Sequence, residues 1–128
     1  MVDIQTKRVY EPYEASDGYR VLVDRLWPRG LTKERVHYDC WEKALAPSNE
    51  VRRAFGHKPE NWAAFQKAYT AELDADPAAA AFAEELAAGS HPKVTLLYGA
   101  KNTAMNQAVV LREWLLKRLG GAAAGSGA

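Results

Sequence analysis

The chain has 128 residues, with 17 lysines and arginines against 16 aspartates and glutamates, and a formal charge of +1. This length fits one domain, and 48% hydrophobic with 26% charged residues is typical of a soluble globular protein. The balanced charge excludes a generally basic nucleic-acid coat and an acidic disordered tail. A single cysteine, Cys40, excludes an internal disulfide and a cysteine-only metal site.

No segment predicts export or membrane insertion. The first ten residues include Asp3, Lys7 and Arg8, so they form no apolar signal core. The longest apolar run, residues 78–83, is far shorter than the roughly twenty residues that a membrane span requires. A lone thiol is compatible with the cytosol. The sequence therefore predicts a cytoplasmic protein.

Two segments carry the strongest strand signal. Residues 19–26 and 93–98 are short, rich in Val and Leu, and bounded by glycine or proline. Neither alternates cleanly between apolar and polar residues, which is typical of strands covered on both faces in a parallel sheet. Residues 4–10 form a weaker candidate strand whose polar residues suit the edge of a sheet.

Three helices are expected between the two strong strands. Ser48 is the N-cap of the first, and Gly56 supplies its left-handed stop. Pro59 suits the first position of the second helix, and Pro77 opens a third, alanine-rich helix that ends near Gly89. The apolar residues of the second helix form one stripe at helical spacing, namely Trp62, Phe65, Tyr69 and Leu73.

The last helix is expected from about residue 104 to residue 119, with an apolar face wide enough to pack on the sheet. Residues 120–128 contain only Gly, Ala and Ser, a composition typical of flexible tails. Strands alternating with helices are typical of α/β proteins. The sequence therefore predicts one compact α/β domain over residues 1–119, with a small, mostly parallel sheet flanked by helices, and a flexible tail over residues 120–128.

Two loops stand where α/β domains usually bind ligands, at the carboxyl ends of strands and near helix N-termini. Residues 24–30, with the sequence Asp-Arg-Leu-Trp-Pro-Arg-Gly, follow the first strong strand. Residues 99–106 follow the second and lead into the last helix. The two loops face each other if the two strands are neighbours.

Basic side chains in and beside these loops indicate a site for a small anion, phosphorylated or nucleotide-like. Arginine forks and helix N-termini both favour phosphate or carboxylate groups. The candidate ligand-binding residues are Arg25, Trp27, Arg29, Lys33, Ser48, Lys101, Asn102 and Asn106. Alternatives stay open: core or rim packing for Trp27, helix capping for Ser48, an ion pair between Asp24 and a basic neighbour, and simple solvation for Lys101.

Asp24 and His57 are the candidate catalytic residues. Histidine transfers protons near neutral pH, and His57 would do so here if the fold brings it to the strand ends. His37, His57 and His91 lie at no recognised metal-ligand spacing, so no metal site is predicted. The chain contains neither of the glycine-rich phosphate-binding signatures G-x-x-x-x-G-K and G-x-G-x-x-G. Their absence argues against a P-loop NTPase and a Rossmann dehydrogenase. No sequence pattern indicates a particular cofactor or a particular oligomeric state.

The chain resembles the short, YeaO-like branch of domain-of-unknown-function family 488, from about Val2 to Leu119. The resemblance rests on residues 20–31, which contain the specific motif DRLWPRG, and on residues 45–48, 55–57 and 96–98. It also rests on Trp41, on the aromatic stripe of the second helix and on residues 106–111. The resemblance implies a compact, soluble, cytoplasmic α/β domain from bacteria, and it implies no agreed reaction.

Carried over to this chain, the family motif falls on Asp24, Arg25, Trp27, Pro28, Arg29, Gly30, Ser48, His57 and Asn106. The family pattern also implies an aspartate near position 102 and a histidine beside Asn106. This chain has Asn102, Met105 and Gln107 there. That departure favours binding, or catalysis that uses Arg25, Lys101 and His57.

The leading hypothesis is a domain that binds a small anion between the two loops. If it is an enzyme, the expected class is hydrolysis or transfer at a phosphorylated or nucleoside-like substrate. The alternative is a non-catalytic protein-interaction or regulatory module. Nucleic-acid binding is disfavoured by the net charge, although Arg52, Arg53 and Lys58 form a local basic patch.

Overall fold

A single parallel sheet organises the chain. The computed structural model describes residues 2–127, and their side chains up to Gly120. The sheet has four strands in the order β1-β4-β2-β3, and each neighbouring pair is parallel. The strands are β1 (Asp3–Arg8), β2 (Tyr19–Leu22), β3 (Cys40–Trp41) and β4 (Lys93–Tyr98). The predicted α/β fold is therefore confirmed, and the two strong strands, β2 and β4, are neighbours.

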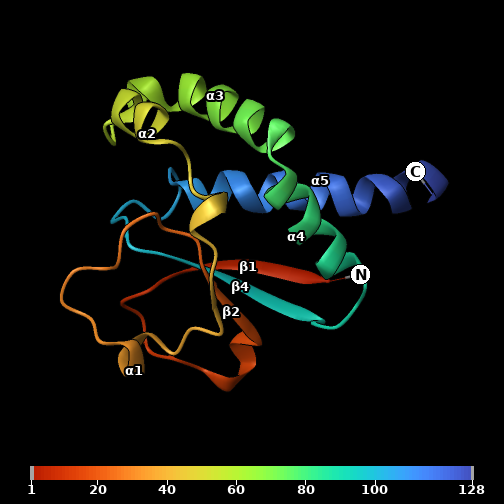
Figure 1. Cartoon of the computed structure of the whole chain (residues 1–128), viewed down its shortest axis with the longest axis horizontal. Coiled ribbons are helices and arrows are strands. Elements are labelled where there is room, and N and C mark those ends of the chain that lie inside the picture. Colours follow the sequence, from red (N-terminus) through yellow and green to blue (C-terminus); the bar gives the residue numbers. More distant parts are fainter. Residues whose placement is uncertain (1, 128) are drawn as a thin grey trace.

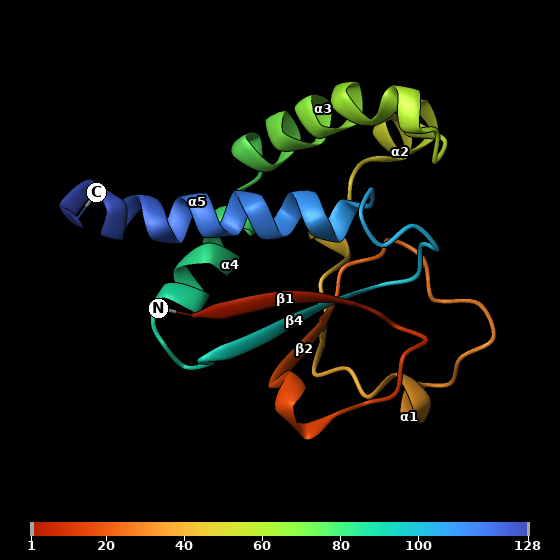
Figure 2. The ribbon, with the colours of Figure 1, turned by 180° about the vertical axis from the view of Figure 1, so that it is seen from behind.

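All helices except the short α1 lie in layers on one face of this sheet (Figure 1). They are α1 (Lys33–Val36), α2 (Asn49–Phe55), α3 (Trp62–Ala75), α4 (Pro77–Ala87) and α5 (Gln107–Gly127). Helices α4 and α5 pack next to the strands, and α2 and α3 lie beyond α5, as the view from behind also shows (Figure 2). The short α1 and its flanking loops lie on the opposite side of the sheet (Figure 1).

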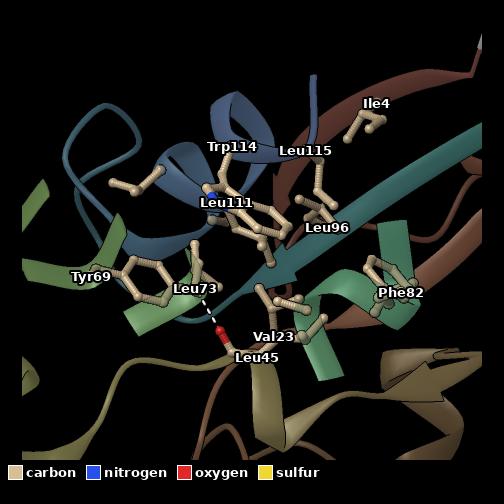
Figure 3. Close-up of a cluster of buried hydrophobic side chains, with 14 of the residues drawn as sticks. Ile4, Val23, Leu45, Tyr69, Leu73, Phe82, Leu96, Leu111, Trp114 and Leu115 are labelled. Carbon is tan, nitrogen blue, oxygen red and sulfur yellow. Dashed lines mark hydrogen bonds between the residues drawn. The ribbon is translucent and has the colours of Figure 1, made fainter. Parts of the chain in front are cut away.

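The main hydrophobic core fills the space between the sheet and the long helices (Figure 3). Leu96 of β4 meets Leu111 and Leu115 of α5 there, and all three side chains are fully buried. Tyr69 of α3 donates its hydroxyl hydrogen bond to the backbone oxygen of Leu45, which ties α3 to the loop that precedes α2. Burial of this apolar surface is the main force that holds the helices on the sheet.

A second, smaller core covers the other face of the sheet. Val9, Leu22, Val36 and Leu97 are buried together, and Trp27 and Trp41 are among the side chains that pack against them. Both faces of the central strands are therefore covered, as their lack of alternation predicts. The cover on this face is built by loops and the four-residue α1, rather than by long helices.

Several boundaries differ from the sequence-based expectation. Strand β2 ends at Leu22 rather than at Leu26, because the chain turns out of the sheet where Asp24 and Arg25 make their own hydrogen bonds. Strand β3 has two residues and carries no periodic signal. Pro59 begins a short 3₁₀ turn ahead of α3 rather than α3 itself. Strand β1 pairs only with β4, so it is the predicted edge strand.

Helix α5 extends from Gln107 to Gly127, beyond the end expected near Leu119. The predicted flexible tail, residues 120–128, falls almost entirely outside the residues whose side chains are described, and stays a prediction. No helix in the described part of the chain is long and apolar enough to cross a bilayer.

Candidate functional site

A cleft of about 500 Å³ opens where the parallel strands end. Tyr10, Asp24 and Gly99, which follow β1, β2 and β4, line its sheet side. Phe55 of α2 and Phe65 of α3 line the helical side. Because parallel strands all end at the same edge, the loops that follow them meet there, which is the usual ligand site of open α/β sheets.

Asp24 joins three elements at the sheet end of the cleft. Its Oδ2 accepts a hydrogen bond from the backbone N–H of Gly99 at 2.8 Å, and its Oδ1 accepts one from the Gln107 side chain at the start of α5. The Trp41 indole N–H donates to the Asp24 backbone oxygen at 2.7 Å. A Cβ atom on residue 99 would lie 2.9 Å from Asp24 Oδ2, so glycine permits this close approach.

The surroundings of Asp24 raise the pKa of its carboxyl. Burial raises the pKa of this carboxyl to about 6, and the hydrogen bonds from Gly99 and Gln107 only partly oppose the effect of burial. Within the described residues Asp24 forms no ion pair. Arg25 instead donates from Nε to the Pro47 backbone oxygen at 3.2 Å. The alternative in which Asp24 pairs with a basic neighbour is therefore wrong for this structure.

Three arginines line the cleft, on two different elements. Arg25 and Arg29 belong to the loop after β2, and Arg52 belongs to α2. The hydroxyl of Tyr10 donates to the Arg29 backbone oxygen at 2.9 Å, which fixes this loop against the end of β1. The Arg52 guanidinium donates to the Asn49 side chain at 3.2 Å, within its own helix.

His57 lies at the same cleft, as the sequence analysis requires for a role in proton transfer. It follows Gly56, the left-handed residue that ends α2, and itself adopts a left-handed backbone with φ of 57°. Its ring is tilted against the ring of Phe55, with 5.7 Å between the centroids. The His57 side chain is exposed, and a left-handed backbone is uncommon for a residue other than glycine.

Trp27 also lines the cleft, but most of its contacts are packing contacts. Its indole N–H donates to the Leu31 backbone oxygen at 2.7 Å. Its ring meets those of Tyr38 and Trp41 edge-on, at 5.6 and 5.3 Å between centroids. Trp27 therefore shapes the loop that carries Arg25 and Arg29, which is the packing alternative foreseen for it.

The other predicted ligand-binding residues do not line this cleft. The Ser48 hydroxyl accepts from the Val51 N–H at 3.2 Å as the N-cap of α2. Asn106 is buried, accepts from the Val109 N–H at 3.0 Å at the start of α5, and donates to the Asn102 backbone oxygen at 2.8 Å.

The remaining members of that set lie at the surface. The Asn102 side chain accepts hydrogen bonds from the backbone N–H groups of Ala104 and Met105, so it shapes the turn before α5. Lys33 on α1 and Lys101 in the loop after β4 are both exposed. The cleft thus collects Asp24, Arg25, Trp27, Arg29 and His57 from the predicted set, while the others stabilise turns or face solvent.

Arg52, Tyr10 and Gln107 line the cleft and are absent from the predicted site. The spacing of Arg52 and Phe55, three residues apart on α2, places both on one helix face and was the available signal for Arg52. Gln107 is visible in the sequence only as a departure from the family pattern. No local signal marks Tyr10, because its place depends on β1 pairing with β4.

Neither a metal centre nor an activated thiol is evident. Within the described residues, no three His, Cys, Asp or Glu side chains gather as a metal site would need. Burial, together with the hydrogen bond that the thiol donates to Glu42 at 2.8 Å, raises the pKa of Cys40 to about 11. A thiol with so high a pKa is a poor nucleophile near neutral pH.

Comparison with known proteins decides the family. A family model described as the inactive DUF488-N3 subclade matches residues 3–127. The chain belongs to the inactive DUF488-N3 subclade. The resemblance noted in the sequence is thereby confirmed, and the DRLWPRG motif of this DUF488-N3 protein is the segment that carries Asp24, Arg25 and Arg29 into the cleft.

Relatives of this DUF488-N3 chain occur in distant bacteria. The uncharacterised protein YeaO of Escherichia coli K12 is 46% identical over 114 residues, which cover 89% of this chain and 97% of YeaO. An uncharacterised protein of Mycobacterium tuberculosis H37Rv is 38% identical over 112 residues, covering 88% of this chain and 92% of the relative. No solved structure matches the chain significantly.

Proposed function

We propose that the protein binds a small anionic, phosphorylated ligand in the cleft between the Asp24–Arg29 loop and Gly99. The observation that carries this proposal is the convergence of Arg25, Arg29 and Arg52 on one cleft, while none of them forms an ion pair within the described residues. Guanidinium groups match phosphate oxygens in pairs, and a partly enclosed site strengthens that attraction.

The apolar part of the cleft fits the rest of a nucleotide-like molecule. Ala46, Pro47, Phe55 and Phe65 form an apolar wall across from the sheet end. Ligand sites commonly combine apolar walls with a few placed polar groups. A phosphate at the arginines and a ring or sugar along this wall would use both parts of the cleft.

The proposal is a binding function, without turnover. Each oxygen of Asp24 already accepts one hydrogen bond, from Gly99 or Gln107, so this carboxylate has a structural role in holding the site together. The family model that matches this chain is described as an inactive subclade, which supports the same choice. Hydrolysis or transfer at a phosphorylated substrate would require Asp24 or His57 to move protons, and an observed turnover would overturn the binding proposal.

Thermal unfolding with a ligand panel tests the proposal. The panel holds inorganic phosphate, nucleotides, sugar phosphates and divalent metal ions. A ligand at one hundred times its Kd adds about 2.7 kcal/mol, which raises the midpoint by several degrees. A selective rise that Arg25→Ala or Arg52→Ala removes, and that the exposed Lys33→Ala retains, supports the cleft. A flat panel, or shifts that survive both arginine variants, contradicts it.

A second candidate function is a protein-interaction module. Leu26 is 63% exposed and Tyr10 43% exposed, and both lie at the same cleft. Exposed apolar side chains beside arginines are common at protein interfaces. This candidate predicts a flat ligand panel together with a specific partner that co-purifies with the wild-type chain and is lost with Leu26→Ser.

We also propose that the protein acts in the cytoplasm of a bacterium. The relatives come from Escherichia coli and Mycobacterium. The only cysteine is a protonated, weakly reactive thiol, which suits a reducing compartment.

The formal charge of +1 argues against a nucleic-acid partner. Fractionation of a native host and a low-salt nucleic-acid binding assay check these two points.

A further inference from the structure

The carboxylates of Asp17 and Asp24 have opposite kinds of hydrogen-bond partners. Asp17 is 2% exposed and accepts hydrogen bonds from two cationic side chains, Lys7 at 3.0 Å and Arg20. Its negative charge is therefore compensated inside the protein. A buried charge with such partners is the normal arrangement, because an uncompensated one is costly.

Asp24 receives no such compensation. Its partners are a backbone N–H, from Gly99, and a neutral amide, from Gln107. Its sequence neighbour Arg25 donates to the Pro47 backbone oxygen instead. A carboxylate offers about four acceptor positions, and the hydrogen bonds of Asp24 occupy two. Asp24 lines the cleft, so a ligand bound there can use its two remaining acceptor positions.

This arrangement constrains where an anion can bind. A phosphate close to Asp24 would be repelled by the carboxylate, whereas a phosphate at Arg25, Arg29 and Arg52 would be attracted by three cations. A donor group on the same ligand would find the unused acceptor positions of Asp24 when the anion lies at the arginines. A ligand that carries both an anionic group and a donor group would use both the arginine end and the Asp24 end of the cleft.

We propose that the ligand is bipolar: beside its anionic group it carries an N–H or O–H donor, an ammonium or a hydroxyl, that hydrogen-bonds to Asp24. This inference rests on the anion site proposed above and makes Asp24 the specificity-determining residue of the cleft. Simple anions bind only the arginine end. Phosphorylated amines and phosphorylated polyols bind both ends and are the expected ligand class.

Three matched probes test the inference, namely ethyl phosphate, 2-hydroxyethyl phosphate and phosphoethanolamine. They share the ethyl phosphate ester and differ only in the substituent on its far carbon, which is a hydrogen, a hydroxyl or an ammonium. Each is titrated into the ¹⁵N-labelled full chain at pH 7.5, and the amide signals of Gly99 and Ala100 report binding beside Asp24. We expect phosphoethanolamine to bind about tenfold more tightly than ethyl phosphate, with 2-hydroxyethyl phosphate between them.

Variants separate the two ends of the cleft. Asp24→Asn should abolish the preference for the ammonium probe while ethyl phosphate still binds. Arg25→Ala should weaken the binding of all three probes by a similar factor and leave the order of their affinities unchanged. Should Asp24→Asn fail to fold, the wild-type chain is titrated at pH 5 instead: protonation of Asp24, whose pKa burial raises to about 6, should then reduce the preference for phosphoethanolamine over ethyl phosphate.

The outcomes distinguish this inference from the proposed function. If ethyl phosphate binds and the other two probes bind no more tightly, the anion site stands and the bipolar ligand is wrong. A preference for phosphoethanolamine that survives Asp24→Asn, or is unchanged between pH 7.5 and pH 5, also overturns the inference. If none of the three probes binds, both the anion site and the bipolar ligand are wrong.

Discussion

The Asp24 carboxylate accepts a hydrogen bond from the backbone N–H of Gly99 across a distance of 2.8 Å. This contact joins the loops that follow β2 and β4, and the Gln107 side chain adds the first residue of α5 to the same carboxylate. One acidic side chain thus holds together the three segments that form the sheet end of the cleft. Asp24 builds the site as well as lining it.

Gly99→Ala should destabilise the protein by about 1–3 kcal/mol, the usual cost of overpacking. The added methyl group would lie 2.9 Å from Asp24 Oδ2, and this oxygen is not free to move away because Gln107 holds the other oxygen of the carboxylate. Urea unfolding of both chains measures the change. In an Asp24→Ala background the same substitution should cost clearly less, so a strictly additive double-mutant cycle would rule out the proposed clash.

Asp24 should titrate near pH 6, well above the ordinary carboxyl value of 3.8, because burial disfavours its charged form. The native state then binds more protons than the unfolded state between about pH 4 and pH 6. The contribution of Asp24 to the free energy of unfolding therefore falls as pH rises through this window, by at most about 3 kcal/mol. The difference in unfolding free energy between wild type and Asp24→Asn isolates this contribution. A difference that stays flat from pH 4 to pH 7 would contradict the raised pKa.

Asn106→Ala should cost about 1–2 kcal/mol of stability through the loss of the N-cap of α5. The Asn106 side chain accepts from the Val109 N–H and donates to the Asn102 backbone oxygen, and it is 1% exposed. Chemical unfolding provides the measurement, with Thr103→Ala at an exposed neighbouring position as the control. A loss of ligand affinity without a loss of stability would instead return Asn106 to the binding site.

Asp17→Ala should destabilise the fold by about 3–5 kcal/mol, because it leaves the buried Arg20 without a carboxylate partner and Lys7 with only the exposed Glu14. The matched control is Asp3→Ala. The Asp3 carboxylate pairs with Lys93 at 2.8 Å on the surface, and its loss should cost less than about 1 kcal/mol. Equal costs for the two variants would show that burial does not strengthen the inner pair.

Acid should unfold the protein partly through Asp17. Burial opposes ionisation of this carboxyl, but hydrogen bonds from Lys7 and the Glu14 backbone outweigh it and hold the pKa below the ordinary value of 3.8. The stability that Asp17 contributes is therefore present above pH 4 and is lost as pH falls through its lowered pKa, which is the opposite sign to Asp24. Unfolding curves of wild type and Asp17→Asn between pH 2 and pH 5 should converge at the acidic end.

Local patterns predicted much of the secondary structure and the location of the cleft. Ser48 and Gly56 mark the two ends of α2 as predicted, because a cap and a left-handed stop depend on neighbouring residues only. The bounds of β4 match the predicted segment for a similar reason, since Pro92 and Gly99 bracket a short segment rich in Val and Leu. The placement of the 24–30 loop at the cleft followed from the general rule that clefts of open α/β sheets lie at the strand ends.

The sequence by itself determined the fold class, the family and the basic character of the loop after β2, since each depends on residue types at fixed spacing. Only the tertiary structure decided which cations share the cleft. Arg52 lines it, whereas Lys101 does not, because α2 packs over the strand ends and the loop after β4 turns Lys101 to solvent. It also decided that Asp24 has neutral partners while Asp17 has cationic ones. Contacts between segments far apart in the chain set both outcomes, and no local pattern encodes them.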